Sequence, residues 1–384
     1  MQGIRILDLS RVLAGPWATQ QLADQGAEVI KVEPPGGDES RRFAPVVDGK
    51  STYFLALNRN KRSICIDLKT DAGRKVLGHL IARSDVLVEN YRPGVAEVLG
   101  LHWSELSARH PRLIYVAIRA FGETAAQWSG RPGYDMVLQC VGGAASFNGF
   151  PDHAPARSGL PSADLFTGLE TVKAVLLALL HRERTGEGQR VVVNMMQAQG
   201  AALVYHASRQ AVTGESEVQR GSAHRGLVPY DLYRCSDGWL AVACGNDRMW
   251  QRLRDVLDIE DRPEWRENLG RIAEREVIDG LINASLKHWT TASADALLAT
   301  VNVPAGPVND VAGAMANPAL EKIILADPVL GDVHVPGPAL RLKGTRVRHA
   351  APPELAIHRD EILVEAGLTS IEIESLSDRG AFGR

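Results

Sequence analysis

The feature that most restricts the fold is an alternation, over the first two hundred residues, of short β-branched apolar runs with amphipathic helical segments. Parallel strands need long connections, and helices usually supply them, so this alternation is the signature of βαβ units. We expect strands at residues 4–9, 28–32, 63–68, 85–89, 113–118 and 190–193, and helices at 16–25, 71–83 and 103–109. The fold class that follows is doubly wound α/β.

A second pattern begins near Tyr230, where two strand-like runs flank the turn Ser236-Asp-Gly238 and indicate a β-hairpin. Helical segments at residues 248–257, 271–289 and 294–301 follow, so a large domain at 1–200 is succeeded by a smaller α+β domain at 225–300. The Pro- and Gly-rich residues 303–308 mark a boundary or a sharp loop. We expect residues 305–384 to return to the large domain, with a short helix at 360–367.

The composition argues against several classes of function. Lys and Arg total 43 against 46 Asp and Glu, so no overall positive field is present to hold nucleic acid or a membrane surface. The longest apolar stretch, residues 172–180, is far shorter than the roughly 20 residues that span a bilayer. The first strand begins almost at Met1, which leaves no room for a secretion signal, and we expect a cytoplasmic protein. The four cysteines have neither zinc-ligand nor redox spacing, so no metal site is predicted.

One helix carries the candidate chemistry. Apolar residues recur at helical spacing from Leu165 to Leu180, and further apolar positions widen the stripe, so residues 162–186 are predicted to form a largely buried helix. Basic residues followed by Gly186 suit its C-terminal end. Asp164 stands at the other end, where a carboxylate serves either as a helix N-cap or as a reactive group held by the helix dipole. The local sequence leaves both interpretations open.

A series of ordered motifs resembles one enzyme family. They are residues 3–20, residues 26–38, residues 58–69, Asn90-Tyr-Arg-Pro-Gly94, the Asp164 helix, and Arg184-Thr-Gly-Glu-Gly188. Together they are similar to class III coenzyme A (CoA) transferases of the carnitine and bile-acid type (CaiB/BaiF). The resemblance implies a Rossmann-like large domain built from both ends of the chain, a small domain between them, and two subunits interlocked as a homodimer.

The same resemblance implies the chemistry. Asp164 aligns with the aspartate that carries the acyl group and then CoA covalently, with acyl-CoA and a carboxylic acid as substrates and no permanently bound cofactor. The positions that match the family's CoA contacts are Val12, Ile66, Lys69, Asn90, Tyr91, Arg92, Arg119 and Phe121. Lys69 and Arg119 also stand at the C-terminal edges of predicted strands, where open α/β sheets bind their ligands.

Departures from the family pattern leave alternatives open. Leu13 replaces a glutamine that some members place near the chemistry, and a glycine run that closes their site is absent, Gly245 being the nearest glycine. Related α-methylacyl-CoA racemases carry a histidine at Tyr134 and a glutamate close to Asn246, so the paired acid and base of a racemase are missing here. A non-catalytic CoA-binding protein is a further alternative, whereas a NAD-dependent dehydrogenase lacks its glycine fingerprint.

The acyl substrates are not determined by these motifs. Several arginines, including Arg157, Arg220 and Arg225, suggest a second carboxylate on the substrate, because guanidinium groups pair well with carboxylates. Succinyl-CoA with an itaconate-, malate- or glutarate-like acid is the resulting hypothesis.

Overall fold

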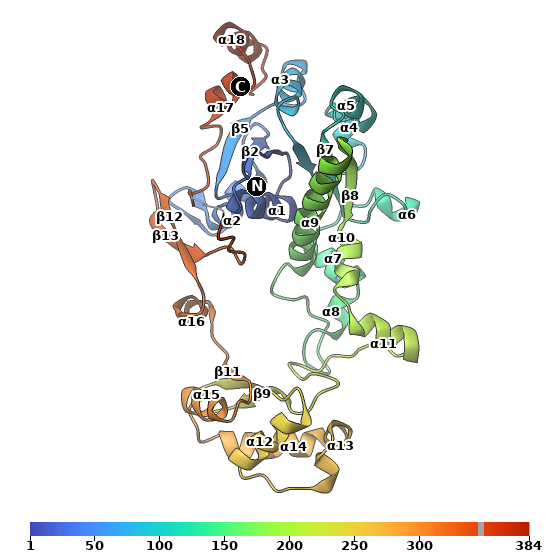
Figure 1. The fold of residues 1–384 in the computed structure, drawn as a ribbon, viewed down its shortest axis with the longest axis vertical. Helices are drawn as coiled ribbons and strands as arrows, with labels where there is room; N and C mark the ends of the chain where they lie inside the picture. The colour runs from blue at the N-terminus through green and yellow to red at the C-terminus, as the bar shows by residue number, and fades with distance from the viewer. Residues whose placement is uncertain (345–348, 384) are drawn as a thin grey trace. The chain divides into compact units, whose positions relative to one another are not determined.

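The computed structural model describes residues 1–344 and 349–383 (Figure 1). Its main sheet has six parallel strands in the order β5-β2-β1-β6-β7-β8. The strands are β1 (Arg5–Asp8), β2 (Glu28–Glu33), β5 (Lys61–Cys65), β6 (Val86–Glu89), β7 (Ile114–Arg119) and β8 (Arg190–Asn194). All six lie within three residues of the boundaries predicted from the sequence, and in chain order they follow the 3-2-1-4-5-6 arrangement of a Rossmann fold.

Helices cover both faces of this sheet. On one face, α1 (Ala14–Asp24) and α9 (Ser162–Thr185) pack on side chains such as Ile6, Val29 and Val88. On the other face, α3 (Asp71–Ile81) and α5 (Trp103–Arg109) pack with alternate residues of the same strands, including Leu7 and Ile30. Because successive side chains of a strand point to opposite faces, each central strand is buried on both sides, which explains its continuous apolar run.

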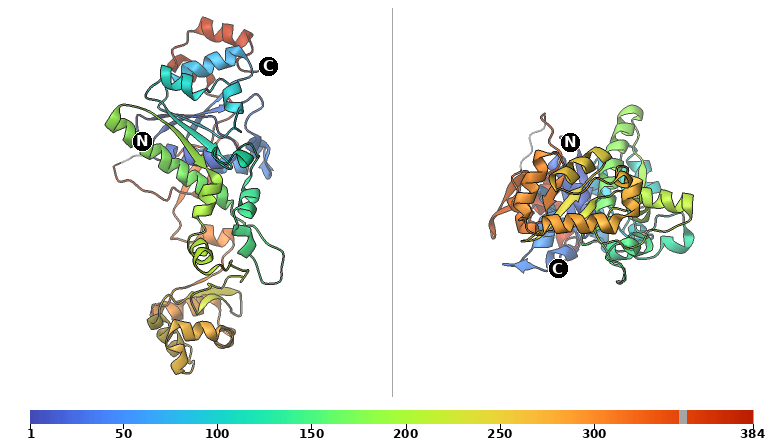
Figure 2. Two further views of the ribbon diagram at one scale, coloured as in Figure 1. Left: turned by 90° about the vertical axis from the view of Figure 1, so that its right-hand side faces the viewer. Right: turned by 90° about the horizontal axis from the view of Figure 1, so that it is seen from below.

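The C-terminal residues complete the large unit beside edge strand β5. The backbone N–H of His358 donates to Ser63 O at 3.2 Å, and the N–H of Asp67 donates to Ala381 O at 2.7 Å. Between these two contacts the chain forms helices α17 (Arg359–Glu365) and α18 (Ser370–Asp378), and α18 packs beside α3 (Figures 1 and 2). The expected helix at residues 360–367 is α17.

The remaining elements of the large unit are short. They are η1 (Glu39–Arg42), β3 (Val46–Val47), β4 (Lys50–Ser51), α2 (Thr52–Leu57), α4 (Val95–Val98), α6 (Ala126–Ser129), α7 (Asp135–Val141), α10 (Met195–Ala201), α11 (Tyr205–Thr213), β12 (Lys322–Asp327) and β13 (Gly331–Pro336). Among residues 1–344 and 349–383, no helix is long and apolar enough to cross a membrane.

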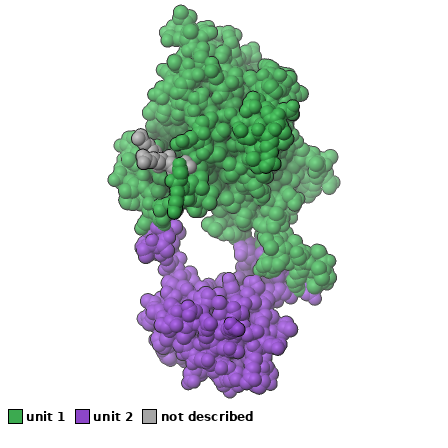
Figure 3. All heavy atoms as spheres, in the orientation of Figure 1, with its two compact units in different colours: residues 1–144, 157–214, 321–384 green, residues 145–156, 215–320 purple. Residues whose placement is uncertain are grey.

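The chain divides into two compact units (Figure 3). The large unit comprises residues 1–144, 157–214 and 321–384, and the small unit comprises residues 145–156 and 215–320. The small unit is therefore wider than the 225–300 segment expected from the sequence, and the return to the large unit comes at Glu321 rather than near 305. Helix α8 (Ala144–Phe147) spans one of the divisions.

The small unit has its own core. An antiparallel sheet, β9 (Tyr230–Arg234), β10 (Trp239–Ala243) and β11 (Ala305–Pro307), packs with helices around Trp250 and Trp265, which are both buried. Its helices are α12 (Asp247–Val256), η2 (Pro263–Trp265), α13 (Asn268–Ala273), α14 (Arg275–Leu286), α15 (Thr291–Thr300) and α16 (Val311–Ala316). The hairpin and α+β character predicted for this segment are present.

Two details of the small unit differ from the sequence prediction. The helix expected at residues 271–289 is broken at Glu274, whose non-helical backbone (φ −114°, ψ 30°) is both the C-cap of α13 and the N-cap of α14. Buried Arg271 of α13 donates to Val228 O and Trp265 O. The expected loop at residues 303–308 contains strand β11, which pairs with β10. Pro307 is tolerated there because β11 is an edge strand.

Candidate active site

A cavity of about 160 Å³ opens where the strand order reverses, beyond the carboxyl ends of β1 and β6. In open α/β sheets ligands bind at this switch point. Its walls come from the segment after β1, the segment after β6, the end of β7 and the first turn of α9, and Asp164 is one of the lining residues. The fold therefore brings the candidate carboxylate to the ligand-binding edge of the sheet.

Close packing between α9 and α1 determines where Asp164 lies (Figure 1). Gly168 lies one turn after Asp164, and a Cβ atom added to it would lie 2.6 Å from the ring of Trp17 and 3.1 Å from Ala14 O. Only glycine allows this approach. The start of α1 and the first turn of α9 thereby both reach the cavity, which Ala14 and Asp164 line.

Asp164 is not a helix cap. It is the third residue of α9, whose N-cap position is Pro161, so the capping interpretation of Asp164 was wrong. The cap is supplied instead by Asp135, whose Oδ1 accepts the backbone N–H of Ala163 at 2.9 Å and of Asp164 at 3.5 Å. Gln139 Nε2 donates to Asp135 Oδ2 at 2.7 Å and holds that carboxylate in place.

The electrostatic surroundings of Asp164 favour its protonated form. Burial, and after it the nearby negative charge of Asp135, raises the pKa of Asp164 to about 7. Among the described residues, no hydrogen bond to the Asp164 carboxylate is present to stabilise its charge. A carboxylate that is poorly solvated and poorly paired is a stronger nucleophile than one held by a salt bridge, and its pKa lies near working pH.

Helix α9 is less buried than its sequence predicts. The inner face consists of small residues, with Ala163, Thr171, Val175 and Ala178 buried. The leucine stripe instead faces outward, and apolar side chains of this face are 39–59% exposed: Phe166, Leu169, Leu176, Leu177 and Leu180. The prediction of a largely buried helix was wrong for this chain taken alone, because close contact with α1 selects small residues on the inner side. The C-terminal prediction is confirmed, since Gly186 ends the helix at φ 82°.

Five of the positions expected to contact CoA line the Asp164 cavity: Val12, Asn90, Tyr91, Arg92 and Arg119. Arg119 ends β7 as expected, but it is buried, with Nη2 lying 2.6 Å from Glu89 Oε1. Its charge is therefore already neutralised. Arg92, in contrast, is exposed at the cavity.

Two further positions line a neighbouring cavity of about 370 Å³, beyond β2 and β5. They are Ile66 and Lys69. Tyr91 and Arg11 line both cavities. Lys69 is not at a strand end as expected, because β5 stops at Cys65 and Lys69 lies exposed in the turn before α3. Phe121 lines neither cavity and packs against Trp128 with ring centroids 4.9 Å apart.

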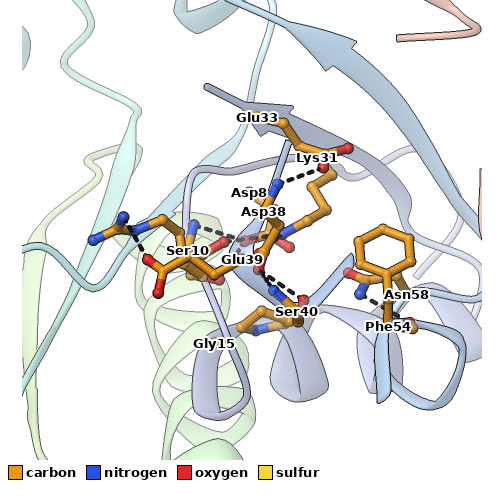
Figure 4. A network of polar contacts seen from close by, with 12 residues as sticks. Asp8, Ser10, Gly15, Lys31, Glu33, Asp38, Glu39, Ser40, Phe54 and Asn58 are labelled. Atoms are coloured by element: carbon orange, nitrogen blue, oxygen red, sulfur yellow. Dashed lines mark hydrogen bonds and ion pairs between the residues drawn. The ribbon is translucent and has the colours of Figure 1, made fainter. Parts of the chain in front are cut away.

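Charged side chains of β1, β2 and β5 form a buried network with Asp38, which follows β2 (Figure 4). Lys31 Nζ lies 2.8 Å from Asp38 Oδ2, and Lys61 Nζ lies 3.0 Å from Asp8 Oδ2. Burial lowers the pKa of Lys61 to about 8, while Asp8 opposes the shift. Lys31 Nζ also donates to Ser10 O at 3.0 Å, so the network reaches the backbone that leads into the cavity wall.

Comparison with known proteins identifies the family. The model of CoA-transferase family III matches residues 1–359. The chain belongs to CoA-transferase family III. The succinate–glutarate CoA-transferase of Agrobacterium fabrum is 35% identical over 382 residues, covering 95% of both chains. The human succinyl-CoA:glutarate CoA-transferase is 35% identical over 95% of this chain and 85% of the relative.

Other relatives agree with this assignment. The succinyl-CoA:mesaconate CoA-transferase of Haloarcula marismortui is 35% identical and covers 96% of both chains. The crystal structure of a CaiB/BaiF family protein from Brucella suis superposes with a TM-score of 0.85 at 36% identity, over 95% of this chain and 98% of the other. The resemblance stated from the motifs is confirmed, and the protein is a CoA-transferase.

The acid and base of a racemase are missing from this family III transferase. Tyr134 is 64% exposed and lines the Asp164 cavity. Asn246 is a helix cap in the small unit, where its Oδ1 accepts the N–H of Met249 at 3.0 Å. Neither position carries the histidine or the glutamate that the racemases have there.

The arginines that suggested a dicarboxylate are differently placed. Arg225 Nη1 lies 2.8 Å from Glu217 Oε1, and Arg220 Nε lies 3.6 Å from the same oxygen. Arg157 donates to the neighbouring Ser158 O. The Asp164 cavity is lined by other arginines: besides Arg11, Arg92 and Arg119 it includes Arg131, which stacks over the Trp128 ring at 4.2 Å.

Arg131 and Asp135 were not among the predicted site residues. Both lie within three residues of Tyr134, the position that was compared with the racemases, so their place in the sequence was already a usable signal. Their contact with Asp164 or its cavity depends on how α7 packs against α9, which the spacing of residues does not reveal.

Proposed function

We propose that this transferase moves CoA from succinyl-CoA to a second dicarboxylic acid, with Asp164 as the covalent carrier. The observation that supports this proposal most is the position of Asp164: a carboxylate with raised pKa, lining a cavity at the switch point. The relatives named for succinyl-CoA and for glutarate or mesaconate support the choice of substrates.

The proposed reaction has four balanced steps. The Asp164 carboxylate attacks the thioester carbonyl of succinyl-CoA, which gives a succinyl–aspartyl anhydride and CoA thiolate. The thiolate attacks the aspartyl carbonyl of the anhydride, so succinate leaves and aspartyl-CoA remains. The acceptor carboxylate attacks aspartyl-CoA, releasing the thiolate and forming a new anhydride. The thiolate then attacks the acceptor acyl carbonyl, and the Asp164 carboxylate is regenerated.

CoA is proposed to extend across both cavities. Its thioester end lies in the Asp164 cavity beside Val12, Tyr91 and Arg92, and its nucleotide end lies in the neighbouring cavity beside Ile66 and Lys69. The exposed cations Arg92 and Lys69 suit phosphate groups. Arg119 and Phe121 support these walls from within, because the first is paired with Glu89 and the second packs on Trp128.

A homodimer is the proposed assembly, and the cytosol the proposed compartment. The exposed apolar face of α9 supports a second copy, since large contiguous apolar surfaces mark interaction sites. The four free cysteines suit a reducing compartment.

The decisive experiment follows new CoA thioesters by mass spectrometry. Wild type and Asp164→Asn are incubated with succinyl-CoA and separately with glutarate, mesaconate, itaconate, malate and oxalate. Transfer by wild type and a loss of at least a thousandfold in the variant are expected, because the covalent carrier is removed. Absence of transfer to every acid, with CoA still bound, would favour a non-catalytic CoA-binding protein.

A second measurement tests the intermediate. Hydroxylamine added during turnover converts an anhydride or thioester on Asp164 into a hydroxamate, which peptide mass mapping locates. Turnover without modification of Asp164 would contradict the covalent role. Deuterium uptake at the α-carbon of a 2-methylacyl-CoA would instead indicate racemase chemistry.

A further inference from the structure

The cavity wall contains a strained residue, Val12. Its φ is +68°, in the left-handed region that β-branched residues rarely adopt. The next residue, Leu13, has φ −129° and ψ −66°, and α1 begins directly after it without a side-chain cap. Val12, Leu13 and Ala14 all line the Asp164 cavity. The unusual turn therefore determines which backbone groups the start of α1 presents to a ligand.

Such a conformation persists only where its surroundings enforce it. Asn90 restrains the residue before Val12. Its Oδ1 accepts the N–H of Arg11 at 2.9 Å, and its Nδ2 donates to Arg11 O at 2.8 Å. Both ends of the carboxamide are thus bonded to the residue immediately before Val12.

These two bonds continue the pairing of β1 with β6 beyond the end of the strands. The last backbone bond between the two segments runs from the N–H of Leu9 to Val88 O at 2.9 Å. The Asn90 side chain then takes the place of a peptide group and holds Arg11 as a strand neighbour would. Arg11 is kept in register with the segment after β6, and the change of direction falls on Val12.

The residue between Leu9 and Arg11 is fixed independently. Ser10 N donates to Asp8 Oδ1 at 3.0 Å, and Ser10 O accepts from Lys31 Nζ at 3.0 Å (Figure 4). On the other side, α1 is held against α9 through Gly168. Leu13, on the other side of Val12, accepts the N–H of Trp17 through its backbone O at 2.8 Å, as part of the first turn of α1. The bonds of Asn90 hold the residue before Val12, so their loss would release the turn on that side.

We propose that Asn90 is a positioning residue: it holds Val12 in its left-handed conformation and acts on CoA through the backbone at the start of α1, without contacting CoA itself. The inference rests on the proposed function in assigning CoA to this cavity. It differs from the expectation that Asn90 is a direct CoA contact, because the carboxamide already uses one donor and one acceptor on Arg11, which fixes its orientation toward the backbone.

A double-mutant cycle separates the two roles. Wild type, Asn90→Ala, Val12→Gly and the double variant are compared for CoA binding by calorimetry. Glycine adopts positive φ without strain, so the turn no longer needs the clamp. We expect Asn90→Ala to weaken CoA binding at least tenfold when Val12 is present and less than threefold in the Val12→Gly background. An equal loss in both backgrounds would show direct contact between Asn90 and CoA and overturn the inference.

Unfolding of the same four proteins in urea gives a test that needs no ligand. Val12→Gly removes strain only where Asn90 maintains it, so the unfolding midpoint should rise more when Asn90 is intact than in the Asn90→Ala background. Equal shifts would overturn the inference.

A wild type that binds no CoA would refute the proposed function, and the urea cycle would still decide the role of Asn90. If Asn90→Ala does not fold, Asn90→Asp, which keeps the acceptor for Arg11 N–H, replaces it in both cycles.

Asn283 supplies a matched control. In the small unit its Oδ1 accepts the N–H of Arg234 at 2.8 Å and its Nδ2 donates to Asp279 O at 2.9 Å, and it lines neither CoA cavity. Asn283→Ala should lower the unfolding midpoint while CoA affinity stays within twofold of wild type. A tenfold loss of CoA affinity in this control would mean that lost stability alone explains the effect of Asn90→Ala, against the inference.

Discussion

Asp135 caps the helix that presents Asp164, because its Oδ1 accepts hydrogen bonds from the backbone N–H groups of Ala163 and Asp164. Free N–H groups at a helix start normally stabilise a nearby negative charge. Here one carboxylate occupies them and adds its own charge, so the other carboxylate loses that help. Burial is the main reason why the pKa of Asp164 is raised although it lies in the first turn of a long helix, and the charge of Asp135 adds to the rise.

Asp135→Asn is expected to move the pH dependence of the reaction. Asparagine keeps an oxygen that can cap α9 but removes the negative charge beside Asp164, so the pKa of Asp164 should fall below its value of about 7. Because the nucleophile must be ionised, the acidic limb of the kcat/KM profile should have its midpoint near pH 7 in wild type and at lower pH in the variant. A profile with an unchanged midpoint would contradict this electrostatic role.

Asp164→Asn is expected to stabilise the protein at high pH only. The folded-state pKa of Asp164 is raised above its ordinary value of 3.8, so the stability associated with its protonated form is present below pH 4 and is lost as pH rises through about 7. The variant should unfold at a higher urea concentration than wild type at pH 8, by on the order of 2 kcal/mol, and similarly to wild type at pH 4. A stabilisation equal at both pH values would refute the assignment.

Gly168→Ala is expected to destabilise the fold and impair transfer. The added methyl group would meet the Trp17 ring and Ala14 O, and forcing α9 from α1 should cost about 1–3 kcal/mol and displace Asp164. Gly78→Ala in α3 is the matched control, because a Cβ there meets nothing within 4 Å. It should stabilise the helix by about 0.5–1 kcal/mol. Urea unfolding and kcat report both effects, and similar behaviour of the two variants would exclude the packing explanation.

Leu177→Glu is expected to disrupt the proposed homodimer. Leu177 is 59% exposed on the apolar face of α9, and burying a carboxylate against a second copy would be unfavourable. Sedimentation velocity should show a dimer for wild type and monomers for the variant at micromolar concentration. Ile371→Glu in α18, at a residue 79% exposed, is the control and should remain a dimer. A dimer that tolerates Leu177→Glu would place the interface elsewhere.

Much of the fold was predictable because its strands are buried on both faces. Continuous runs such as residues 114–119 have no alternative that hides so many β-branched residues, and the strand boundaries followed. The exposed leucines of α9 were misassigned for the opposite reason: an apolar stripe shows that a face is covered, without showing whether the same chain or another one covers it. Strand β11 was missed because Pro307 is a turn signal unless the strand lies at an edge.

The candidate site was predictable only in part. Asp164 was singled out by its helix and by resemblance, whereas the cap contributed by Asp135 and the clamp contributed by Asn90 join residues 28 or more positions apart. Arg119 has the residue type expected for a phosphate contact, yet Glu89 neutralises it on the adjacent strand. Charge pairing of this kind depends on strand order, which periodicity along one chain does not encode.

The contacts between edge strand β5 and residues 356–382 bear on how the chain is made. On the ribosome, every strand of the main sheet emerges before the segment that covers its β5 edge, whereas the small unit is complete once Leu320 has emerged. The nascent large unit thus presents an open strand edge until synthesis of the segment beyond residue 350 ends. Stalled or truncated chains should therefore be the species that chaperones retain and that aggregate.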